Sequence, residues 1–348
     1  MMRFMQNEQN ENIPAKRTSI LSKTRPEETE VSMESRSSKK LQVIINPAAG
    51  VGRPILQALN AGLRDTGIEW DVSITHKAGD AERLAKEAVE NGADIVGVHG
   101  GDGSVMEVAS ALRGMSTPMA IFPGGTANVM SVELGIPSTD IEGSIDFIAK
   151  GNYTTRLIDM GRVNDRLFLL RIGIGLEADM MKSADQEVKN RFGVLAYAFS
   201  ALNEMRNLTP TLYRVRVDGE LHEIEGVSCM IANSGNVAIS GLTLSKKIDI
   251  SDGVLDVVIF RSADLASMIA VSAAVMSPDA EATDSPQLEH YQGREIVVET
   301  DPPQTISIDG EVIEPITLTV TILPGAVNVV VPVPLGEAPG KANFAAAG

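Results

Sequence analysis

Residues 41–150 alternate between short apolar runs and amphipathic segments, and this alternation limits the fold more than any other feature of the chain. The run at residues 94–99 (DIVGVH) is short enough for a strand, whereas residues 80–92 (DAERLAKEAVENG) repeat their apolar positions with helical spacing. The same strand–helix theme occurs four times before residue 150. Alternation of this kind predicts an α/β domain with a parallel sheet and helices on its faces.

After residue 150 the pattern changes to short runs with strand character and Asp-Gly turns. Residues 154–163 and 166–175 have the form of a hairpin, and a helical pattern covers Ala178–Asn207. The β-like runs that follow predict a second, mainly antiparallel β domain. The expected division of the chain is a disordered extension at residues 1–40, an α/β domain at 41–150, a mainly β domain at 151–334 and a loose tail at 335–348.

Composition and charge exclude several classes of function. The net charge of −16 disfavours nucleic acid as a partner, because a phosphate backbone is met by Lys and Arg. No apolar run reaches the roughly 18–20 residues of a transmembrane helix, and residues 1–40 lack the apolar centre of a signal peptide. The single cysteine, Cys229, excludes an internal disulfide, and the histidines lack the spacing of zinc ligands. We therefore expect a cytoplasmic protein.

Three of the expected strands end in glycine-rich loops, at residues 46–52 (NPAAGVG), 100–103 (GGDG) and 123–128 (PGGTAN). In a parallel sheet, the loops beyond the carboxyl ends of the strands line the ligand crevice. Several glycines before a helix leave backbone N–H groups open to an anion. An ordinary strand-to-helix turn is the alternative for each loop taken alone. Their expected crowding at one sheet edge favours a phosphate-binding site.

The polar residues of these loops indicate how they would bind a nucleotide. Asp102 can hold Mg²⁺ that bridges phosphate oxygens. Thr126 and Asn128 offer a hydroxyl and an amide to phosphate or ribose, while Asn46 and Arg53 supply a second amide and a cation.

Ser104 and Glu107 have the spacing of a capping box. In that motif the first residue begins the helix and the acid three residues later folds back on the same first turn. The pattern therefore predicts that the helix after the GGDG loop begins at Ser104, and it explains both residues without a ligand.

Taken in order, residues 46–50 (NPAAG), 100–107 (GGDGSVME) and 125–128 (GTAN) resemble the catalytic domain shared by diacylglycerol kinases, sphingosine kinases and bacterial lipid kinases. The likeness continues through residues 156–164 (RLIDMGRVN), 168–181, 246–260 and 306–332. The resemblance implies a two-domain fold that transfers the γ-phosphate of ATP to a lipid hydroxyl with Mg²⁺. It also implies a cytoplasmic enzyme that acts peripherally at a membrane surface.

The resemblance implies roles for individual residues. Besides Asn46, Arg53 and Asn128, it implies nucleotide contacts from Thr75, Gly100, Gly101, Asp102, Gly103, Ser104, Glu107, Gly125 and Thr126. A structural Mg²⁺ site is implied for Asp249, Asp252 and the carbonyl of Val254. Glu311 matches the general base, and Asp309 and Asp102 are the other expected catalytic residues. From the residues alone, the alternative for Asp309-Gly310 is a hairpin turn, and for Asp252-Gly253 a solvated turn.

Ala49, Arg53 and Val129 depart from the family pattern, which often has polar residues or Lys in the first loop and Asp after Asn128. Ala49 and Val129 motivate a second hypothesis, a non-catalytic regulator that binds nucleotide or lipid. NAD kinase, which shares the GGDG loop, is a third. The GxGxxA match at Gly173–Ala178 lies outside the alternating region, so we expect no dinucleotide site there. The sequence leaves open which lipid is the substrate and whether the chain forms a homo-oligomer.

Overall fold

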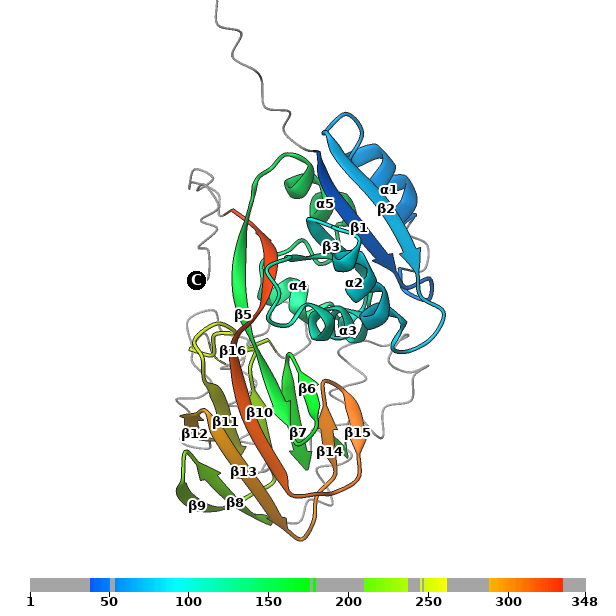
Figure 1. The fold of residues 1–348 in the computed structure, drawn as a ribbon. Helices are drawn as coiled ribbons and strands as arrows, with labels where there is room; N and C mark the ends of the chain where they lie inside the picture. The colour runs from blue at the N-terminus through cyan, green and yellow to red at the C-terminus, as the bar shows by residue number, and fades with distance from the viewer. Residues whose placement is uncertain are drawn as a thin grey trace, which may run out of the picture. The chain divides into compact units, whose positions relative to one another are not determined.

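A parallel sheet with helices on its faces forms the first region of the chain (Figure 1). The structure is a computed structural model, and it describes residues 38–50, 54–175, 178–179, 210–236, 245, 247–261 and 288–333. The elements of this region are β1 (Lys39–Ile45), α1 (Ile55–Gly62), β2 (Ile68–Ile74), α2 (Asp80–Glu90), β3 (Ile95–Gly100), α3 (Asp102–Leu112), β4 (Met119–Pro123), α4 (Val129–Glu133) and α5 (Ile141–Ala149). The predicted alternation of strands and helices is confirmed.

The strand order places the loops that follow β1, β2, β3 and β4 at one edge of the sheet. Parallel pairs join β2 to β1, β1 to β3 and β3 to β4, so the carboxyl ends of all four strands point the same way. β3 and β4 are buried along their whole length, as expected for strands covered on both faces. β2 is the edge strand and only partly buried.

The second region is mainly antiparallel, as predicted. Its strands are β5 (Tyr153–Val163), β6 (Arg166–Phe168), β7 (Arg171–Gly175), β8 (Thr211–Val217), β9 (Glu220–Gly226), β10 (Ser228–Ala232), β11 (Leu255–Phe260), β12 (Leu288–Gly293), β13 (Glu295–Asp301), β14 (Ile306–Ile308), β15 (Glu311–Ile313) and β16 (Leu318–Pro332). β7, β10, β11, β12, β14 and β15 form a six-stranded sheet. Its apolar side chains share a core with those of β8, β13 and β16 from the other sheet, in the manner of a sandwich.

β16 contributes to both regions. It pairs antiparallel with β13 through residues 318–321, and farther along it meets β4 in parallel, Val329 opposite Met119. β5 lies beside it over most of its length (Figure 1). One ten-stranded sheet therefore continues from β2 to β9, and the described residues belong to one compact unit that begins at Ser38. The domain limits expected from the sequence stay a prediction.

The expected hairpin at residues 154–175 is only partly present. β5 and β6 form a hairpin with Asn164 in the left-handed region (φ 49°) at its turn, but β7 leaves it and pairs with β10 and β14 in the other sheet. Both neighbours of β7 are antiparallel, so Gly173 and Gly175 do not belong to a parallel βαβ unit of the kind that typically binds dinucleotides. Apart from residues 178–179, the expected helical stretch Ala178–Asn207 lies outside the described residues. Within the part that the structure describes, every helix is too short or too polar to span a bilayer.

Candidate nucleotide site at the carboxyl edge of the parallel sheet

Hydrogen bonds hold the glycine-rich loops together at the carboxyl edge of the sheet. The amide of Gly50 donates to the carbonyl of Gly124 at 2.6 Å, and the amide of Gly124 donates to Gly100 at 2.9 Å. Asn46 joins the first loop to α3, because its Nδ2 donates to Ser104 Oγ at 3.2 Å. The three loops thus lie side by side, as their positions after neighbouring parallel strands led us to expect.

The glycines in these loops are required for different physical reasons. A Cβ on Gly125 would lie 2.6 Å from the Cα of Gly101 in the neighbouring loop, so this position is small because two loops pack against each other. A Cβ on Gly100 would lie 2.5 Å from the Cβ of Ser104, so this position is small because α3 begins close to it. Gly103 is exposed, has no positive φ and has nothing within 4 Å of where its Cβ would be. Its missing side chain therefore keeps open space at the start of α3.

Glu107 lies in α3 but caps the neighbouring helix α2, so the predicted capping box is wrong. Its carboxylate accepts hydrogen bonds from the amides of Gly79 at 2.9 Å and Ala81 at 3.0 Å, at the start of α2. The reason is the position at which α3 begins: Gly101 is the N-cap in an extended conformation, so Ser104 already lies inside the helix. Ser104 Oγ instead accepts the bond from Asn46.

Asp102 caps α4 in the same way. Its two carboxylate oxygens accept hydrogen bonds from the amides of Val129 at 3.2 Å and Met130 at 3.1 Å. α3 thus provides caps for α2 and α4, while its own N-terminus has no side-chain cap. An uncapped helix start with open space above Gly103 leaves N–H groups and the positive end of the helix dipole available to an anion.

The loop after β2 completes the site, and its contribution was only partly predicted. Thr75 is buried and its amide donates to the carbonyl of Ile45 at 3.0 Å. Asp80 holds the following turn, because its Oδ2 accepts the amides of His76 at 2.9 Å and Lys77 at 3.1 Å. These bonds, that of His76 first, lower the pKa of the Asp80 carboxyl. The rule that located the other loops, position after a parallel strand, also identifies this one.

A cavity of about 380 Å³ lies among these loops. Its volume is within the usual range of small-molecule sites. It is lined by Asn46, Pro47, Ala48, Thr75, His76, Lys77, Ala78, Ala81, Gly103, Ser104 and Glu107. Lys77 is the cation that this lining offers to a phosphate at neutral pH. The residues present therefore fit an anionic ligand at the start of α3, and the contacts predicted for Thr75, Gly103 and Ser104 stay predictions that this cavity supports.

Other predicted nucleotide contacts have different positions in the structure. Asn128 is buried, with φ 48°, and uses its amide inside the loop: Oδ1 accepts the Gly125 amide at 2.8 Å, and Nδ2 donates to the carbonyls of Gly125 and Ser138. It closes the loop, and a direct contact with a nucleotide would require these bonds to open. Thr126 is exposed at the tip. Arg53 lies outside the described residues.

Asp309 and Glu311 belong to a tight hairpin. Asp309 (φ 46°) and Gly310 (φ 88°) form a two-residue turn in which Ile308 pairs with Glu311, so the turn that the residues alone suggested is present. The Asp309 carboxylate accepts the amides of Leu169 at 2.8 Å, Leu170 at 2.9 Å and Arg171 at 3.0 Å. Burial raises the pKa of this carboxyl, and the three donors oppose the rise. A direct catalytic role for Asp309 stays a prediction, since its oxygens already have these partners.

Glu311 is exposed and lines a second cavity, of about 680 Å³. This cavity lies along the same two helices as the first: Ala81 and Glu107 line one, and the adjacent residues Glu82 and Met106 line the other. Its lining is Glu82, Lys86, Met106, Ser110, Ala111, Arg113, Met115, Asp165, Arg166, Leu167 and Glu311. Among the cavities lined by described residues, Glu311 and the glycine loops line different ones, and both cavities lie along α2 and α3.

The expected metal ligands are near one another in the loop before β11. Asp252 accepts the amide of Val254 at 3.0 Å, and Asp249 forms an ion pair with Arg156. Burial, together with the carboxylates of Asp256, Asp249 and Asp159, raises the pKa of Asp252. Carboxylate oxygens are ligands that Mg²⁺ prefers, and the Mg²⁺ site implied by the resemblance stays a prediction. Among the described residues, however, no three acidic, His or Cys side chains converge in a metal-binding arrangement.

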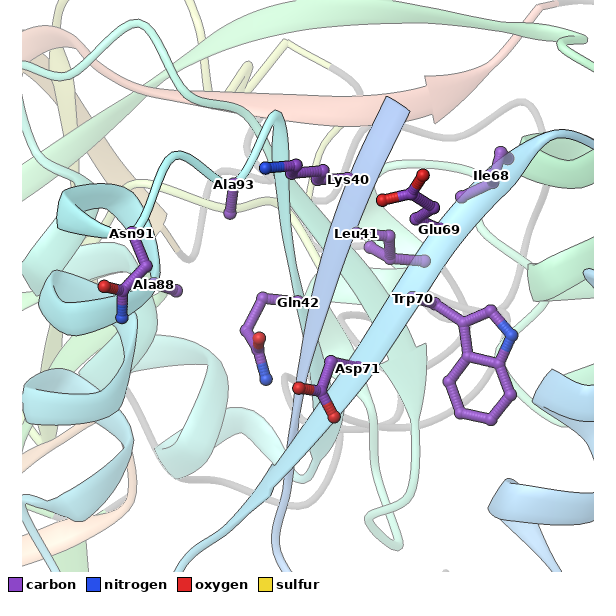
Figure 2. Close-up of a pocket in the computed structure, with 10 residues that line it drawn as sticks. All are labelled: Lys40, Leu41, Gln42, Ile68, Glu69, Trp70, Asp71, Ala88, Asn91 and Ala93. Atoms are coloured by element: carbon purple, nitrogen blue, oxygen red, sulfur yellow. The ribbon is translucent and has the colours of Figure 1, made fainter. Parts of the chain in front are cut away.

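A further cavity of about 620 Å³ lies at the sheet edge, along β1 and β2. Figure 2 shows Gln42 and Asp71 on the side of α2, and the Trp70 ring on the other side of β2. Its lining is part polar and part apolar, and Ala88 of α2 belongs to it. The glycine loops do not contribute to this lining.

Two family models match the chain: one, for the diacylglycerol kinase catalytic domain, covers residues 40–163, and the other, for the YegS C-terminal NAD kinase beta sandwich-like domain, covers residues 171–331. An uncharacterised protein of Synechocystis is 32% identical over 314 residues, which is 85% of this chain and 71% of that protein. The chain belongs to the family of diacylglycerol kinase-like lipid kinases. The resemblance stated from the motifs is therefore confirmed.

Other relatives in this family agree with the assignment. A diacylglycerol kinase of Bacillus subtilis is 27% identical over 277 residues, which is 78% of this chain and 90% of that enzyme. A solved structure of a diacylglycerol kinase from Bacillus anthracis has a TM-score of 0.64 at 21% identity and covers 84% of this chain and 97% of its own. At that identity the structure supports the fold alone.

Sequence reasoning did not identify Glu133, Ser234 or Asn236. Glu133 ends α4, and its Oε2 accepts hydrogen bonds from Ser234 Oγ at 2.7 Å and from the amide and Nδ2 of Asn236. These residues are about a hundred positions apart in the chain and carry no motif, so only the folded structure relates them.

Proposed function

We propose that the chain is an ATP-dependent lipid kinase that transfers the γ-phosphate of ATP to a lipid hydroxyl. The observation that supports this most is the uncapped start of α3, which adjoins a cavity built from the loops after β1, β2 and β3. The open space at Gly103 has no explanation in packing or backbone conformation. Because the chain belongs to the lipid kinase family, we propose the phosphates of ATP as the anion bound there.

In this proposal the N–H groups at the start of α3 and the side chain of Lys77 bind the phosphates of ATP. The loop bonds at Asn46 and Asn128 fix the positions of these groups before the nucleotide arrives. Mg²⁺, with Asp102 as a candidate ligand, would neutralise charge on the phosphate oxygens. Asp102 accepts two amides and a carboxylate has about four lone pairs, so acceptor capacity remains.

Glu311 is the proposed general base. It would accept the proton of the lipid hydroxyl as that oxygen bonds to the γ-phosphorus and the bond to the oxygen of ADP breaks. The apolar side chains of Met106, Met115 and Leu167 line its cavity and suit the apolar part of a lipid. Arg113 and Arg166 at the same cavity suit an anionic membrane surface, although the whole chain is acidic.

The test is a transfer assay with γ-labelled ATP, Mg²⁺ and either a mixed lipid extract or NAD. We expect label in lipid products, a loss of at least about a hundredfold in turnover for Glu311→Gln, and a change below about twofold for the control Glu314→Gln. Glu314 is an exposed acid just after β15 and does not line the cavity.

Other results would support NAD kinase activity, a non-catalytic regulator, or a kinase in which Glu311 is not the base. Label in NAD would assign the chain to NAD kinase activity. ATP binding by calorimetry without transfer to any lipid would support the non-catalytic regulator. Lipid labelling that Glu311→Gln leaves unchanged would remove Glu311 from the mechanism while keeping the kinase assignment.

A further inference from the structure

Glu133 connects the end of α4 to the loop after β10. One carboxylate oxygen, Oε2, accepts three hydrogen bonds: from Ser234 Oγ at 2.7 Å, from the Asn236 amide at 3.1 Å and from Asn236 Nδ2 at 2.8 Å. α4 follows the PGGTAN loop, whereas Ser234 and Asn236 extend a strand of the six-stranded sheet. Bonds to an ionised carboxylate are stronger than bonds between neutral groups, so this contact fixes the loop firmly.

The same loop after β10 holds the segment between β6 and β7. The amides of Asn233 and Ser234 donate to the carbonyl of Leu170 at 2.9 and 3.2 Å. Asn233 Nδ2 donates to the carbonyl of Leu169 at 2.7 Å, and Arg171 Nη1 donates to the carbonyl of Asn236 at 2.7 Å. Residues 169–171 therefore bind the loop after β10 mainly by accepting hydrogen bonds at their carbonyl oxygens.

The amides of residues 169–171 face the other way, toward the hairpin that carries Glu311. All three donate to the carboxylate of Asp309, and the Asp309 amide donates back to the carbonyl of Arg171 at 3.0 Å. Asp309 is the first residue of the two-residue turn between β14 and β15. Glu311 follows that turn and pairs with Ile308 on the other side of it. The position of Glu311 therefore depends on residues 169–171.

These contacts form a continuous path. Asp102 of the GGDG loop caps α4, Glu133 ends α4, and the path continues through Ser234 and Asn236 to residues 169–171 and then to Asp309. We propose that Glu133 is a positioning residue, which through this path fixes the Glu311 hairpin relative to α4 and the glycine loops. The kinetic consequence rests on the proposed function, because it matters only if Glu311 is the base. A displacement of about 1 Å at a reacting group can cost about a hundredfold in rate.

The first test does not depend on activity. Amide hydrogen exchange is measured for the full chain, for Glu133→Ala and for the control Glu142→Ala, which removes an exposed acid from α5. Without the carboxylate, the loop after β10 loses its anchor, so we expect the amides of residues 169–171 and 309–311 to exchange at least about tenfold faster. The control should leave these rates unchanged. Unchanged rates in Glu133→Ala would overturn the proposal.

The second test is kinetic. We expect Glu133→Ala to lower kcat about tenfold with the KM for ATP changed by less than about twofold, and Glu133→Gln to recover part of the loss because its amide oxygen can still accept. In a Glu311→Gln background, Glu133→Ala should have no further effect, since the base that it positions is absent. Losses that simply multiply in the double variant would contradict a positioning role. If Glu311→Gln alone is as active as the wild type, the proposed base is wrong, and the exchange rates still decide whether Glu133 holds the hairpin.

Discussion

At the scale of the residue, Asp309 shows how one carboxylate of a family motif holds a turn in place. Its oxygens accept three backbone amides, and its φ of 46° belongs to the turn. The sequence indicated the turn but not the three amide donors, because they lie about 140 positions earlier in the chain. In the structure the turn is present and the carboxylate anchors it.

The raised pKa of Asp309 predicts a pH dependence of stability. Between the ordinary value of 3.8 and the raised value in the folded protein, the folded state binds more protons than the unfolded state, so its stability falls as pH rises. Asp309→Asn removes this dependence and also the acceptor for one amide, at a cost of about 1–3 kcal/mol. We expect its destabilisation to be largest near pH 4 and smaller above the raised pKa, measured by urea unfolding. A difference from the wild type that grows with pH would contradict this.

At the scale of the element, α3 provides the N-terminal caps of its neighbours and has none of its own. Glu107 serves α2 and Asp102 serves α4. The local pattern predicted the strands and helices well, because their apolar spacing is a property of each segment. It failed at the cap, because Glu107 and the start of α2 are 26–28 positions apart. When the capping residue belongs to a different helix, no motif of nearby residues in the sequence indicates the cap.

The cap predicts a specific loss of stability. Glu107→Ala removes the acceptor of the Gly79 and Ala81 amides, so we expect a loss of about 0.5–2 kcal/mol, as for other N-caps. The control is Glu90→Ala, an exposed acid at the end of α2, which should change stability by less than about 0.5 kcal/mol. Thermal unfolding of both variants provides the comparison. Equal losses would show that Glu107 does not cap α2.

At the scale of the whole molecule, two features could not be predicted from the sequence. β16 crosses from the sandwich to the parallel sheet, where Val329 lies opposite Met119, 210 positions earlier. The bonds from Glu133 to Ser234 and Asn236 likewise join segments about a hundred positions apart. The fold class followed from patterns within segments, whereas the neighbouring cavities at the glycine loops and at Glu311 depend on these long-range pairings.

We propose that the loops at the carboxyl edge of the parallel sheet bind the triphosphate of ATP. Amide hydrogen exchange of the full chain with and without saturating ATP and Mg²⁺ tests it most directly. If ATP binds there, amide exchange slows in all four loops together, at residues 46–50, 75–81, 101–104 and 124–128. Unchanged exchange in all four loops, or protection confined to the sheet-edge cavity beside Trp70, would contradict it.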